Sequence, residues 1–410
     1  MLVKLAWRNL WRNKLRTSII IGAMIFGLTG VIAMMGFMTG FVDSLVSNAI
    51  RWQTSHIQVH NKAYLLNPDI SAQIPAANEL INEIRQIPSV DVVSERFLVD
   101  GMVASSRSNR AVRFNGVELD SEAKITPLSQ HITKGEWLDQ QGGNPILVSE
   151  KLAERLNLRV GSKVVLTFTD ANGQVAGAAY RVRGLFKTPS TTFDDRNVFV
   201  RKADLQRTAQ MEGVHEIAVL LKDASEIRNT IEQLNDMVSK APWQGVVTVR
   251  DWQKIQPMLA TMMSTMDVSN QVILIIFVIA MMFGIINIML MSVYERTQEF
   301  GVLMAVGMQK HKIFVLLILE TSMLGAAGAL LGIFLSSVII KALNHFGISL
   351  AAMSDGLGAY GVDTLLRPRV SLEEYVMVLF IVVAASFIAA IYPARQILKQ
   401  RPVDAMAEKR

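Results

Sequence analysis

Four long apolar stretches interrupt this chain, and each is long enough to form a helix that crosses a membrane. A span needs roughly 20 apolar residues to cover about 30 Å of hydrocarbon. The stretches occupy residues 18–42, 272–293, 313–341 and 374–392. The third is long enough to tilt, and the fourth is the shortest. The pattern therefore predicts an integral membrane α-helical protein with four transmembrane helices, one before and three after a long polar segment.

The first apolar stretch resembles a secretory signal peptide only at its basic start. Its apolar core is far longer than the roughly 7–15 residues of a signal peptide, and no A-x-A cleavage site follows it. We therefore expect it to be retained as a membrane anchor.

The polar segment between the first two spans contains short runs of two kinds. “HIQVH” and “DVVSERFLVDGMVA” alternate like half-buried strands, while “AANELINEIRQI” has the spacing of an amphipathic helix. “NPILVSEKLAERLNLRVGSKVVLTFTDANGQVAGAAYRVRGLFKT” predicts a strand, a helix, a glycine turn, a strand, an Asn-Gly hairpin and a further strand.

“RNVFVRKADLQRT” then adds a strand followed by a helix. The segment is therefore predicted to form a large extracytoplasmic α+β domain over residues 55–250, carried on helical stalks. Two subdomains are expected, with a seam at residues 126–137.

Charge is unevenly distributed along the chain and predicts its orientation. Five basic residues and no acidic one precede the first span, whereas residues 41–268 carry 25 basic and 26 acidic residues. The segment after the second span and the C-terminal tail are also basic. Because basic short loops stay in the cytoplasm, both termini are predicted to be cytoplasmic and the large domain periplasmic or extracellular, on a multi-pass protein of the cell inner (plasma) membrane. The net charge of +6 follows from this topology and implies no nucleic acid partner.

The sequence contains no recognisable catalytic, cofactor-binding or metal-binding motif. Asp194 and Asp195 form a tempting acidic pair, but neighbouring carboxylates on a strand point to opposite faces, and we expect a solvated loop there. No G-x-x-x-x-G-K-[ST] phosphate loop occurs, so this chain is not expected to bind ATP by itself. Four histidines of the external domain lack the spacing of metal ligands: His56, His60, His131 and His215.

Both spans that flank the external domain continue as helices with one apolar side. After the external domain, methionines recur along a single helical stripe. Methionine is flexible and polarizable, which suits a surface that meets varied apolar ligands, although ordinary stalk packing explains the stripe as well. The candidate substrate-lining residues are Met34, Phe37, Met38, Phe41, Met258, Met262, Met263 and Met266.

Two polar features lie within the spans. Glu320 is seven residues into the third span, where an ionisable group normally faces a polar partner or water, and Asn287 of the second span is one candidate partner. A structural polar contact is favoured over a proton relay. Small residues at four-residue spacing permit close helix approach in lipid, and they are Gly36 and Gly40, Gly328 and Gly332, and Ala385 and Ala389.

The segment between the second and third spans, “SVYERTQEFGVLMAVGMQKHKIF”, has charged ends and an apolar stripe. Phe300, Leu303, Met304 and Gly307 lie along that stripe. Such a helix is typical of one that lies in the membrane interface or docks into a soluble partner, and the residues alone leave both open.

Three separate motifs resemble the FtsX/MacB-like permeases of type VII ABC transporters. “ERTQEFGVLMAVGM” matches their E-R-x-x-E-x-G-x-x-x-A-x-G motif, “YPARQILKQRPVDAMAEKR” their tail, and “LAWRNLWRNKLRTSI” their amphipathic N-terminal helix. Gln298 and Phe300 depart from the residues usual in the first motif. The likeness covers essentially the whole chain.

The resemblance implies a membrane subunit that binds no cofactor, with ATP and Mg²⁺ bound by a separate cytosolic ABC ATPase dimer. A second permease, identical or different, would complete the complex, and ATP-driven movement would reach the external domain through the stalks. The implied ATPase-coupling residues are Glu295, Arg296, Glu299, Phe300, Gly301, Leu303, Met304, Ala305 and Gly307. The implied tail-motif residues are Tyr392, Pro393, Ala394, Arg395 and Pro402.

The predicted division of the chain combines the apolar pattern with this resemblance. Its segments are an N-terminal amphipathic helix (1–17), the first span (18–42), a stalk (43–54), the external domain (55–250), a second stalk (251–271), the second span (272–293), a cytoplasmic coupling helix (294–312), the third span (313–341), a short external loop (342–373), the fourth span (374–392) and a cytoplasmic tail (393–410).

Within the family, the length, the layout and the methionine-rich stalk are most like the lipoprotein-releasing branch. In that branch a lipid-anchored protein is held between the stalks and lifted from the inner membrane. The predicted substrate is therefore a lipoprotein or another lipophilic molecule, and use of a periplasmic carrier or adaptor is left open. A MacB-like exporter that works with an adaptor and an FtsX-like regulator of an external hydrolase are the alternatives.

Overall fold

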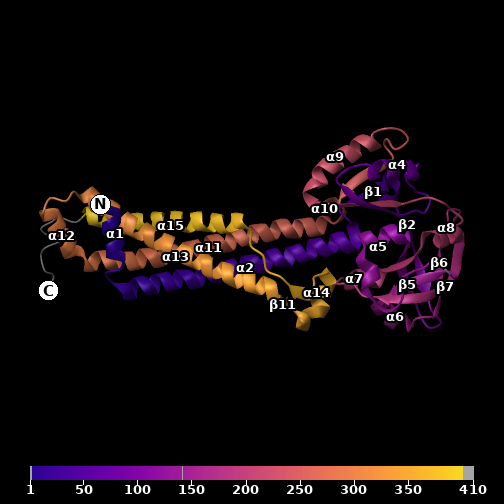
Figure 1. Cartoon of the computed structure of the whole chain (residues 1–410), viewed down its shortest axis with the longest axis horizontal. Helices are drawn as coiled ribbons and strands as arrows, with labels where there is room; N and C mark the ends of the chain where they lie inside the picture. The colour runs from indigo at the N-terminus through magenta and orange to yellow at the C-terminus, as the bar shows by residue number, and fades with distance from the viewer. Residues whose placement is uncertain (1, 141, 400–410) are drawn as a thin grey trace. The chain divides into compact units, whose positions relative to one another are not determined.

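A computed structural model describes residues 2–140 and 142–399, and the chain divides into two compact units (Figure 1). The membrane unit comprises residues up to Val42, Met263–Ser349 and the residues from Leu365 onward. The external unit comprises Asp43–Met262 and Leu350–Thr364.

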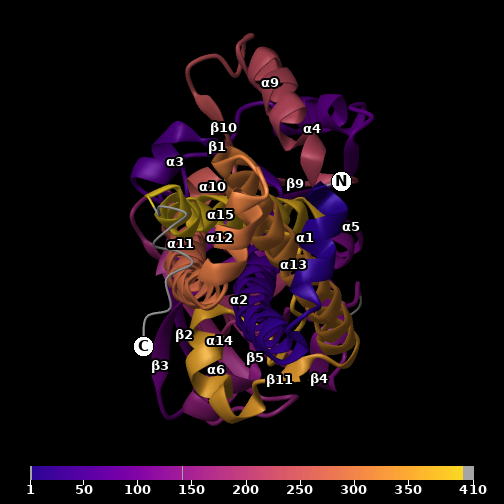
Figure 2. The ribbon, with the colours of Figure 1, turned by 90° about the vertical axis from the view of Figure 1, so that its left-hand side faces the viewer.

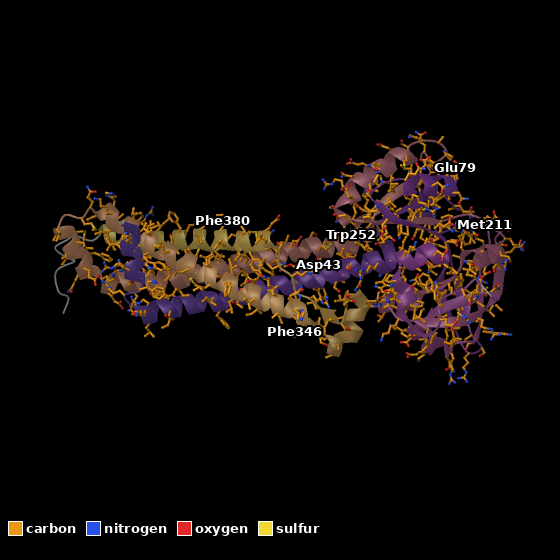
Figure 3. The ribbon with its side chains drawn as sticks, in the orientation of Figure 1. Asp43, Glu79, Met211, Trp252, Phe346 and Phe380 are labelled. Atoms are coloured by element: carbon orange, nitrogen blue, oxygen red, sulfur yellow. The ribbon has the colours of Figure 1, made fainter. Side chains whose placement is uncertain are left out.

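The described residues contain four helices that are long and apolar enough to cross a membrane, which confirms the predicted one-plus-three layout. They are α2 (Lys14–Ala49), α11 (Pro257–Glu295), α13 (Lys310–Phe346) and α15 (Leu372–Lys399). Two shorter helices, α1 (Leu2–Leu10) and α12 (Thr297–Ala305), lie at one end of this bundle (Figures 1 and 2). Large apolar side chains also point away from the bundle, as Phe380 of α15 does (Figure 3), because the surrounding solvent is expected to be lipid.

Small residues bring helices of the membrane unit together, as their spacing predicts. A Cβ built at Gly328 would lie 2.8 Å from a Met24 side-chain atom of α2, and one at Gly332 would lie 3.0 Å from Leu28. Gly40 behaves differently, because a Cβ there would meet the backbone of Arg367 and Pro368 in the segment that leads into α15. At Gly36 a Cβ would lie 2.9 Å from side-chain atoms of Ile340 in α13 and of Val370.

The external unit is built on a ten-stranded mixed sheet. Its main path runs β10-β1-β9-β2-β3-β8-β5-β7-β4, with β6 pairing β2 and β7. The strands are β1 (Ile57–Asn61), β2 (Val90–Ala104), β3 (Asn109–Val117), β4 (Ile132–Gly135), β5 (Pro145–Ser149), β6 (Lys163–Thr169), β7 (Val175–Phe186), β8 (Asn197–Arg201), β9 (Glu216–Leu221) and β10 (Val247–Asp251). The helices are α3 (Lys62–Leu66), α4 (Ala77–Arg85), α5 (Leu119–Ile125), α6 (Glu150–Leu156), α7 (Thr191–Arg196), α8 (Lys202–Ala209), α9 (Ile227–Val238) and α10 (Trp252–Ile255).

Most predicted elements of this domain are confirmed, including the helix α4 and the hairpin of β6 and β7. The domain has two main cores, but they do not divide at residues 126–137 as predicted. One core contains β1, β9 and β10 with α4 and α9, and the other contains β3 and β5 to β8. β2 contributes to both cores, because its first half pairs with β9 and its second half with β3 and β6.

One tryptophan anchors the external end of each stalk. Trp52, in the π-helical turn Ile50–Thr54 after α2, is buried among residues of α5, β5, β7 and β8. Trp252 begins α10 and is buried beside β10, with its backbone N–H donating to the carbonyl of His56. The Gln256 amide donates to the side chain of Gln53 at 3.0 Å, so the two stalk ends also contact each other.

Candidate functional site

The segment between the second and third spans is held against the membrane unit by one face of α12. Phe300 is fully buried in the bundle core, and Gly301 is buried beside it. Leu303 and Met304 pack against the same core. Phe300, Leu303 and Met304 of the apolar stripe therefore contact the bundle, whereas Gly307 of the same stripe is exposed, and docking of this segment stays a prediction.

The outward face of α12 is smaller and different in composition. Val302 and Val306 are 55% and 83% exposed, and Ala305 and Gly307 are exposed with them. Gly307 has φ +97°, a conformation that favours glycine and ends the helix. Of the predicted coupling residues, Ala305 and Gly307 lie on this exposed edge. The two valines were not predicted, because they fall off the main apolar stripe.

Arginine and glutamate side chains from four helices and the segments that connect them meet at α12. We call Arg12, Arg16, Glu295, Arg296, Glu299 and Glu320 the coupling cluster. Arg12 pairs with Glu299 at 2.8 Å, and Arg16 pairs with Glu295. Both arginines precede or begin α2, so these pairs join the N-terminal segment to the loop between the second and third spans.

Arg296 extends this cluster into the membrane unit. Its guanidinium lies 3.1 Å from Glu320 of α13, 3.2 Å from Glu299 and 5.2 Å from the centre of the Phe300 ring. Because the Arg296 and Glu320 side chains are only 12% and 8% exposed, this pair is the buried part of the cluster. Glu320 thus makes a structural polar contact, but not with Asn287, which is exposed on α11.

The electrostatics of the cluster keep its outer glutamate charged. Partial burial acts to raise the pKa of Glu299, but hydrogen bonds from Arg12 and Arg296 outweigh it and hold that pKa below its usual value. A cavity of about 250 Å³ lies beside the cluster and is lined by Asn9, Ile288, Met289 and Leu324 as well as by charged residues. Each charged side chain of the coupling cluster has an ion-pair partner within the cluster.

The predicted tail motif begins inside α15. Pro393 lies within the helix, Ala394 is buried, and Tyr392 and Arg395 are exposed. Proline lacks the N–H that would bond the preceding turn, so the helix continues through a locally weakened position. Pro402 and Ala405 lie outside the described residues.

The methionine stripe remains a prediction. In α11, Met258 is 81% exposed, whereas Met262, Met263 and Met266 are partly buried. In α2, Met34 is exposed, and Phe37, Met38 and Phe41 are partly buried. These side chains therefore keep some accessible apolar surface within each unit, as either substrate lining or stalk packing requires.

The acidic pair of the external domain differs from its prediction as a solvated loop. Asp194 and Asp195 lie in helix α7, and Asp194 is 3% exposed. The hydroxyl of Thr188 donates to the Asp194 carboxylate at 2.7 Å, and Asp195 pairs with Lys151 and Arg155. Burial raises the pKa of Asp194 to about 6, although the Thr188 hydrogen bonds oppose that shift.

A buried ion network connects the two cores of the external unit. Arg96 of β2 contacts Glu122 of α5 and Glu216 of β9, each at 2.7 Å. Two histidines beside it, His60 and His215, hydrogen-bond to neighbouring groups, and burial lowers the pKa of each. Among residues 2–140 and 142–399, no group of three histidine or acidic side chains could hold a metal ion.

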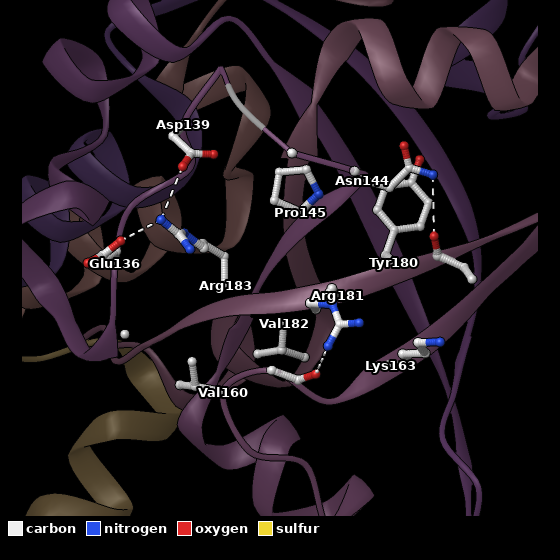
Figure 4. A pocket seen from close by; sticks show the side chains of 15 residues that line it. Glu136, Asp139, Asn144, Pro145, Val160, Lys163, Tyr180, Arg181, Val182 and Arg183 are labelled. Carbon is white, nitrogen blue, oxygen red and sulfur yellow. Dashed lines mark hydrogen bonds and ion pairs between the residues drawn. The ribbon is translucent and has the colours of Figure 1, made fainter.

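A cavity of about 820 Å³ opens on the external unit between β7 and the segment after β4 (Figure 4). Arg183 pairs there with Glu136 and Asp139, and Arg181 donates to the carbonyl of Gly161 at 3.0 Å. The charged groups that carry these contacts neutralise one another, and none is arranged as a nucleophile with a base.

Comparisons with known proteins place both units in described families. Residues 17–237 match the MacB-like periplasmic core domain, and residues 271–402 match the FtsX-like permease C-terminal region. A lipoprotein-releasing system transmembrane protein LolC from Neisseria meningitidis serogroup B is 21% identical over 401 residues, which are 95% of this chain and 93% of that protein. A macrolide export ATP-binding/permease protein MacB from Brucella melitensis is 26% identical over 81% of this chain, but the match covers only 52% of that protein.

A pyoverdine export ATP-binding/permease protein PvdT from Pseudomonas fluorescens is 23% identical over 87% of this chain and 54% of its own length. Among solved structures, the periplasmic region of MacB from Actinobacillus actinomycetemcomitans aligns with 53% of this chain and 97% of its own at 12% identity, with a TM-score of 0.37. The extracellular domain of the transporter YknZ aligns with 48% of this chain and all of its own at 16% identity, with a TM-score of 0.35.

Proposed function

The chain belongs to the FtsX-like permeases that carry a MacB-like periplasmic core domain, and we propose from that premise that it is the membrane subunit of an ABC transporter driven by a separate ATPase. The proposed complex contains two permease subunits and a cytosolic ATPase dimer, which binds the ATP and Mg²⁺. The protein would lie in the inner membrane, with both termini cytoplasmic and the external unit in the periplasm.

One observation carries this proposal: α12 is fixed on its inner side and exposed on its outer side. Phe300 and the Arg296–Glu320 pair join α12 to the bundle and to α13. Val302 and Val306 leave a small apolar edge in contact with solvent. Movement of a partner docked on the outer side of such a helix would also move the bundle. The reason is that the tightly packed inner face moves with the bundle, whereas a loosely packed loop would deform.

The transmitted movement would reach the external unit through continuous helices. α2 and α11 each run without a break from the membrane unit into the external unit, and each ends close to a buried tryptophan, Trp52 or Trp252. ATP-driven movement at α12 could then act on the external domain without a channel through the four spans.

We propose a lipoprotein or another lipophilic molecule of the inner membrane as the substrate. The match that runs along nearly the whole length of a lipoprotein-releasing LolC protein supports this class, as does the accessible apolar surface at Met258 and Met34. Export of a periplasmic substrate with an adaptor is the alternative, in line with the partial matches to MacB and PvdT proteins.

The test is to replace Val306, the exposed residue that follows the last residue of α12, with aspartate. Val306→Asp in the full-length chain should reduce copurification of the partner ATPase by about tenfold, because it places a charge in an apolar contact. Val175→Asp provides the matched control, since Val175 is 79% exposed in the external domain and Val306 is 83% exposed.

Equal recovery of the ATPase with both variants would contradict the proposed docking edge. Identification of the copurified molecules then separates the substrate classes. A bound lipoprotein or lipid supports release from the membrane, whereas a bound adaptor supports export.

A further inference from the structure

The loop between the third and fourth spans carries contacts that the proposed function does not use. Residues 350–364, which we call the strap, belong to the external unit, while the residues on both sides of them belong to the membrane unit. The strap contains a short helix, α14 (Ser354–Tyr360), and its ends are joined by a hydrogen bond from the Leu350 N–H to the Thr364 carbonyl at 2.7 Å.

One side of the strap packs on α7 of the external sheet domain. Gly358 approaches Thr191 so closely that a Cβ at position 358 would lie 2.7 Å from a Thr191 methyl group. The Thr192 hydroxyl donates to the carbonyl of Ala359 at 3.1 Å. α14 is followed by Gly361, whose φ of +79° is the left-handed conformation typical of a helix C-terminus.

A second side of the strap is bound to the part of α2 that lies in the external unit. The Asn48 amide donates to the carbonyl of Gly361 at 2.8 Å, and Asn48 is buried. The Asp363 N–H donates to the hydroxyl of Ser44 at 3.1 Å, and Val362 is 1% exposed. A buried amide left without its partner costs free energy, so these contacts hold the strap in one position.

The two chain segments that connect the strap to α13 and α15 are short, and they pair with each other. β11 (Ile348–Ser349) pairs with β12 (Leu365–Leu366) as soon as α13 has ended. After β12, the Arg369 N–H donates to the carbonyl of Gly36 in α2 at 3.0 Å. Both chain segments that lead to the strap are therefore held by hydrogen bonds within the membrane unit.

We propose that the strap is a permanent third connection through which the third and fourth spans move the external domain, with α7 as its attachment point. This inference rests on the proposed function, because it assigns a transmission path to the same ATP-driven machine. α2 and α11 form the first two connections, and the strap forms a third one from α13 and α15. Glu320 of α13 pairs with Arg296, which directly precedes α12. Asn48, Thr192 and Gly358 are positioning residues of this path.

The first experiment forces a side chain into the contact with α7. Gly358→Leu should detach α14, whereas Gly356→Leu is the matched control, because nothing lies within 4 Å of a Cβ at Gly356 in the same helix. Both changes raise helix propensity equally, so the difference reports the contact alone. Hydrogen exchange of the full-length chain with its ATPase, with and without ATP, measures the effect.

Gly358→Leu should speed exchange in peptides covering residues 355–364 by about tenfold, since the protection there depends on packing. It should also reduce the ATP-dependent change in exchange of residues 55–250 by about half or more, with the ATPase still bound. Gly356→Leu should leave both quantities at the wild-type level. A wild-type response in Gly358→Leu, once the strap exchange has risen, would overturn the proposal.

The second experiment locks the contact in place. The chain has no cysteine, so Thr191→Cys with Gly358→Cys creates a single possible disulfide, and Thr191→Cys also removes the methyl that the new Cβ would meet. Because we propose a permanent attachment, the oxidised protein should keep the full ATP-dependent response of the external domain. Loss of the response on oxidation and its return on reduction would show that the strap must detach, and failure of the pair to oxidise would contradict the contact itself.

These outcomes differ from failure of the proposed function. If no ATPase copurifies with the wild-type chain, or if ATP changes no exchange in the wild-type complex, the transporter assignment fails before any variant is compared.

Discussion

Two arginine–glutamate clusters in this protein have similar members but different surroundings. In the external unit, Arg96 lies between Glu122 and Glu216, and all three side chains are at most 8% exposed. In the coupling cluster, Arg12 and Glu299 are 53% and 47% exposed. Water competes for the second pair but not for the first.

The difference in exposure separates the buried ion pairs, which stabilise the fold, from the exposed ion pairs, which are accessible to a partner. Burial alone would raise the pKa of Glu122, but Arg96 and two hydroxyl groups reverse the shift and leave that pKa below its usual value. Exposed pairs contribute roughly 0–1 kcal/mol and are weakened by salt, so they exchange partners readily. We therefore expect the external cluster to govern stability and the exposed pairs of the coupling cluster to govern association.

The largest expected effect comes from removing the buried arginine. Arg96→Met leaves Glu122 and Glu216 buried without their cation, which should lower the free energy of unfolding of the external domain by about 3–5 kcal/mol. Urea titration of the full-length chain, followed by hydrogen exchange in β2 and β9, measures the loss.

A triple variant provides the control for this prediction. Arg96→Met with Glu122→Gln and Glu216→Gln should recover most of the lost stability, because no uncompensated charge stays buried. If Arg96→Met alone is as stable as the wild type, the buried cluster contributes no more than an exposed pair and the comparison fails.

The next effect concerns a buried carboxylate that no arginine neutralises. Asp194 has a folded pKa of about 6, above its usual value of 3.8, because burial outweighs the Thr188 hydrogen bonds. Its stabilising contribution is therefore fully present below about pH 4 and is lost as the pH rises through 6. At about 1.4 kcal/mol per pKa unit, the loss by pH 7.5 is up to about 3 kcal/mol.

Asp194→Asn should remove this pH dependence, because the amide carries no proton that titrates. Relative to the wild type, the variant should gain stability between pH 4 and pH 7.5, whereas Glu122→Gln should lose stability over the same range. Urea midpoints of the full-length chain at the two pH values give the result. Parallel profiles for Asp194→Asn and the wild type would mean that Asp194 titrates at its ordinary pKa.

Asp194 also illustrates what the sequence could not predict. Local patterns predicted the four spans and most strands, because hydrophobic periodicity acts over neighbouring residues. Adjacent acidic residues near a strand gave no sign of burial. The Ser149 hydroxyl that bonds Asp194 comes from a strand 45 residues away, and the hydrogen bond from nearby Thr188 depends on a backbone turn that the pattern does not show.

The candidate site shows the same limit. The family motif identified Glu295, Arg296 and Glu299 as a group, but their partners Arg12 and Arg16 lie more than 270 residues away. The sequence predicted the apolar stripe of α12 but not the surface that the stripe contacts. A helix with one apolar face can pack on its own bundle, on a membrane or on another protein. The packing of Phe300 shows which residue faces the bundle, and the exposed Val302 shows which residue does not.

A smaller effect is expected at the buried end of the coupling cluster. Glu320→Gln weakens the contact of Arg296 with α13 but keeps an oxygen that can accept its hydrogen bond, so the chain should lose about 1–2 kcal/mol. Hydrogen exchange in α12 should rise with it, as measured in detergent at one pH. Asn287→Gln, a change without a new charge at an exposed position of α11, should leave exchange in α12 unchanged. Unchanged exchange in Glu320→Gln would remove the buried pair from the transmission path.

The smallest effect on stability should accompany a clear effect on association. Glu299→Lys breaks the pairs with Arg12 and Arg296 on the exposed side, which should change the free energy of unfolding by less than about 1 kcal/mol. Copurification of the ATPase should nevertheless fall several-fold. A reversed charge on the docking surface would repel a group of the ATPase that the wild-type glutamate attracts. Glu295→Lys should act in the same way through Arg16.

Asp100→Lys is the matched control for the Glu299 variant, because it breaks an exposed pair, with Arg113, of nearly the same exposure in the external domain. It should cost as little stability and leave the ATPase bound. If the two variants lose the ATPase to the same extent, exposed charge has only a general effect, and the coupling cluster has no special part in docking. If Glu299→Lys instead unfolds the chain, its pairs belong with the buried cluster, and the division between holding the fold and meeting a partner is wrong.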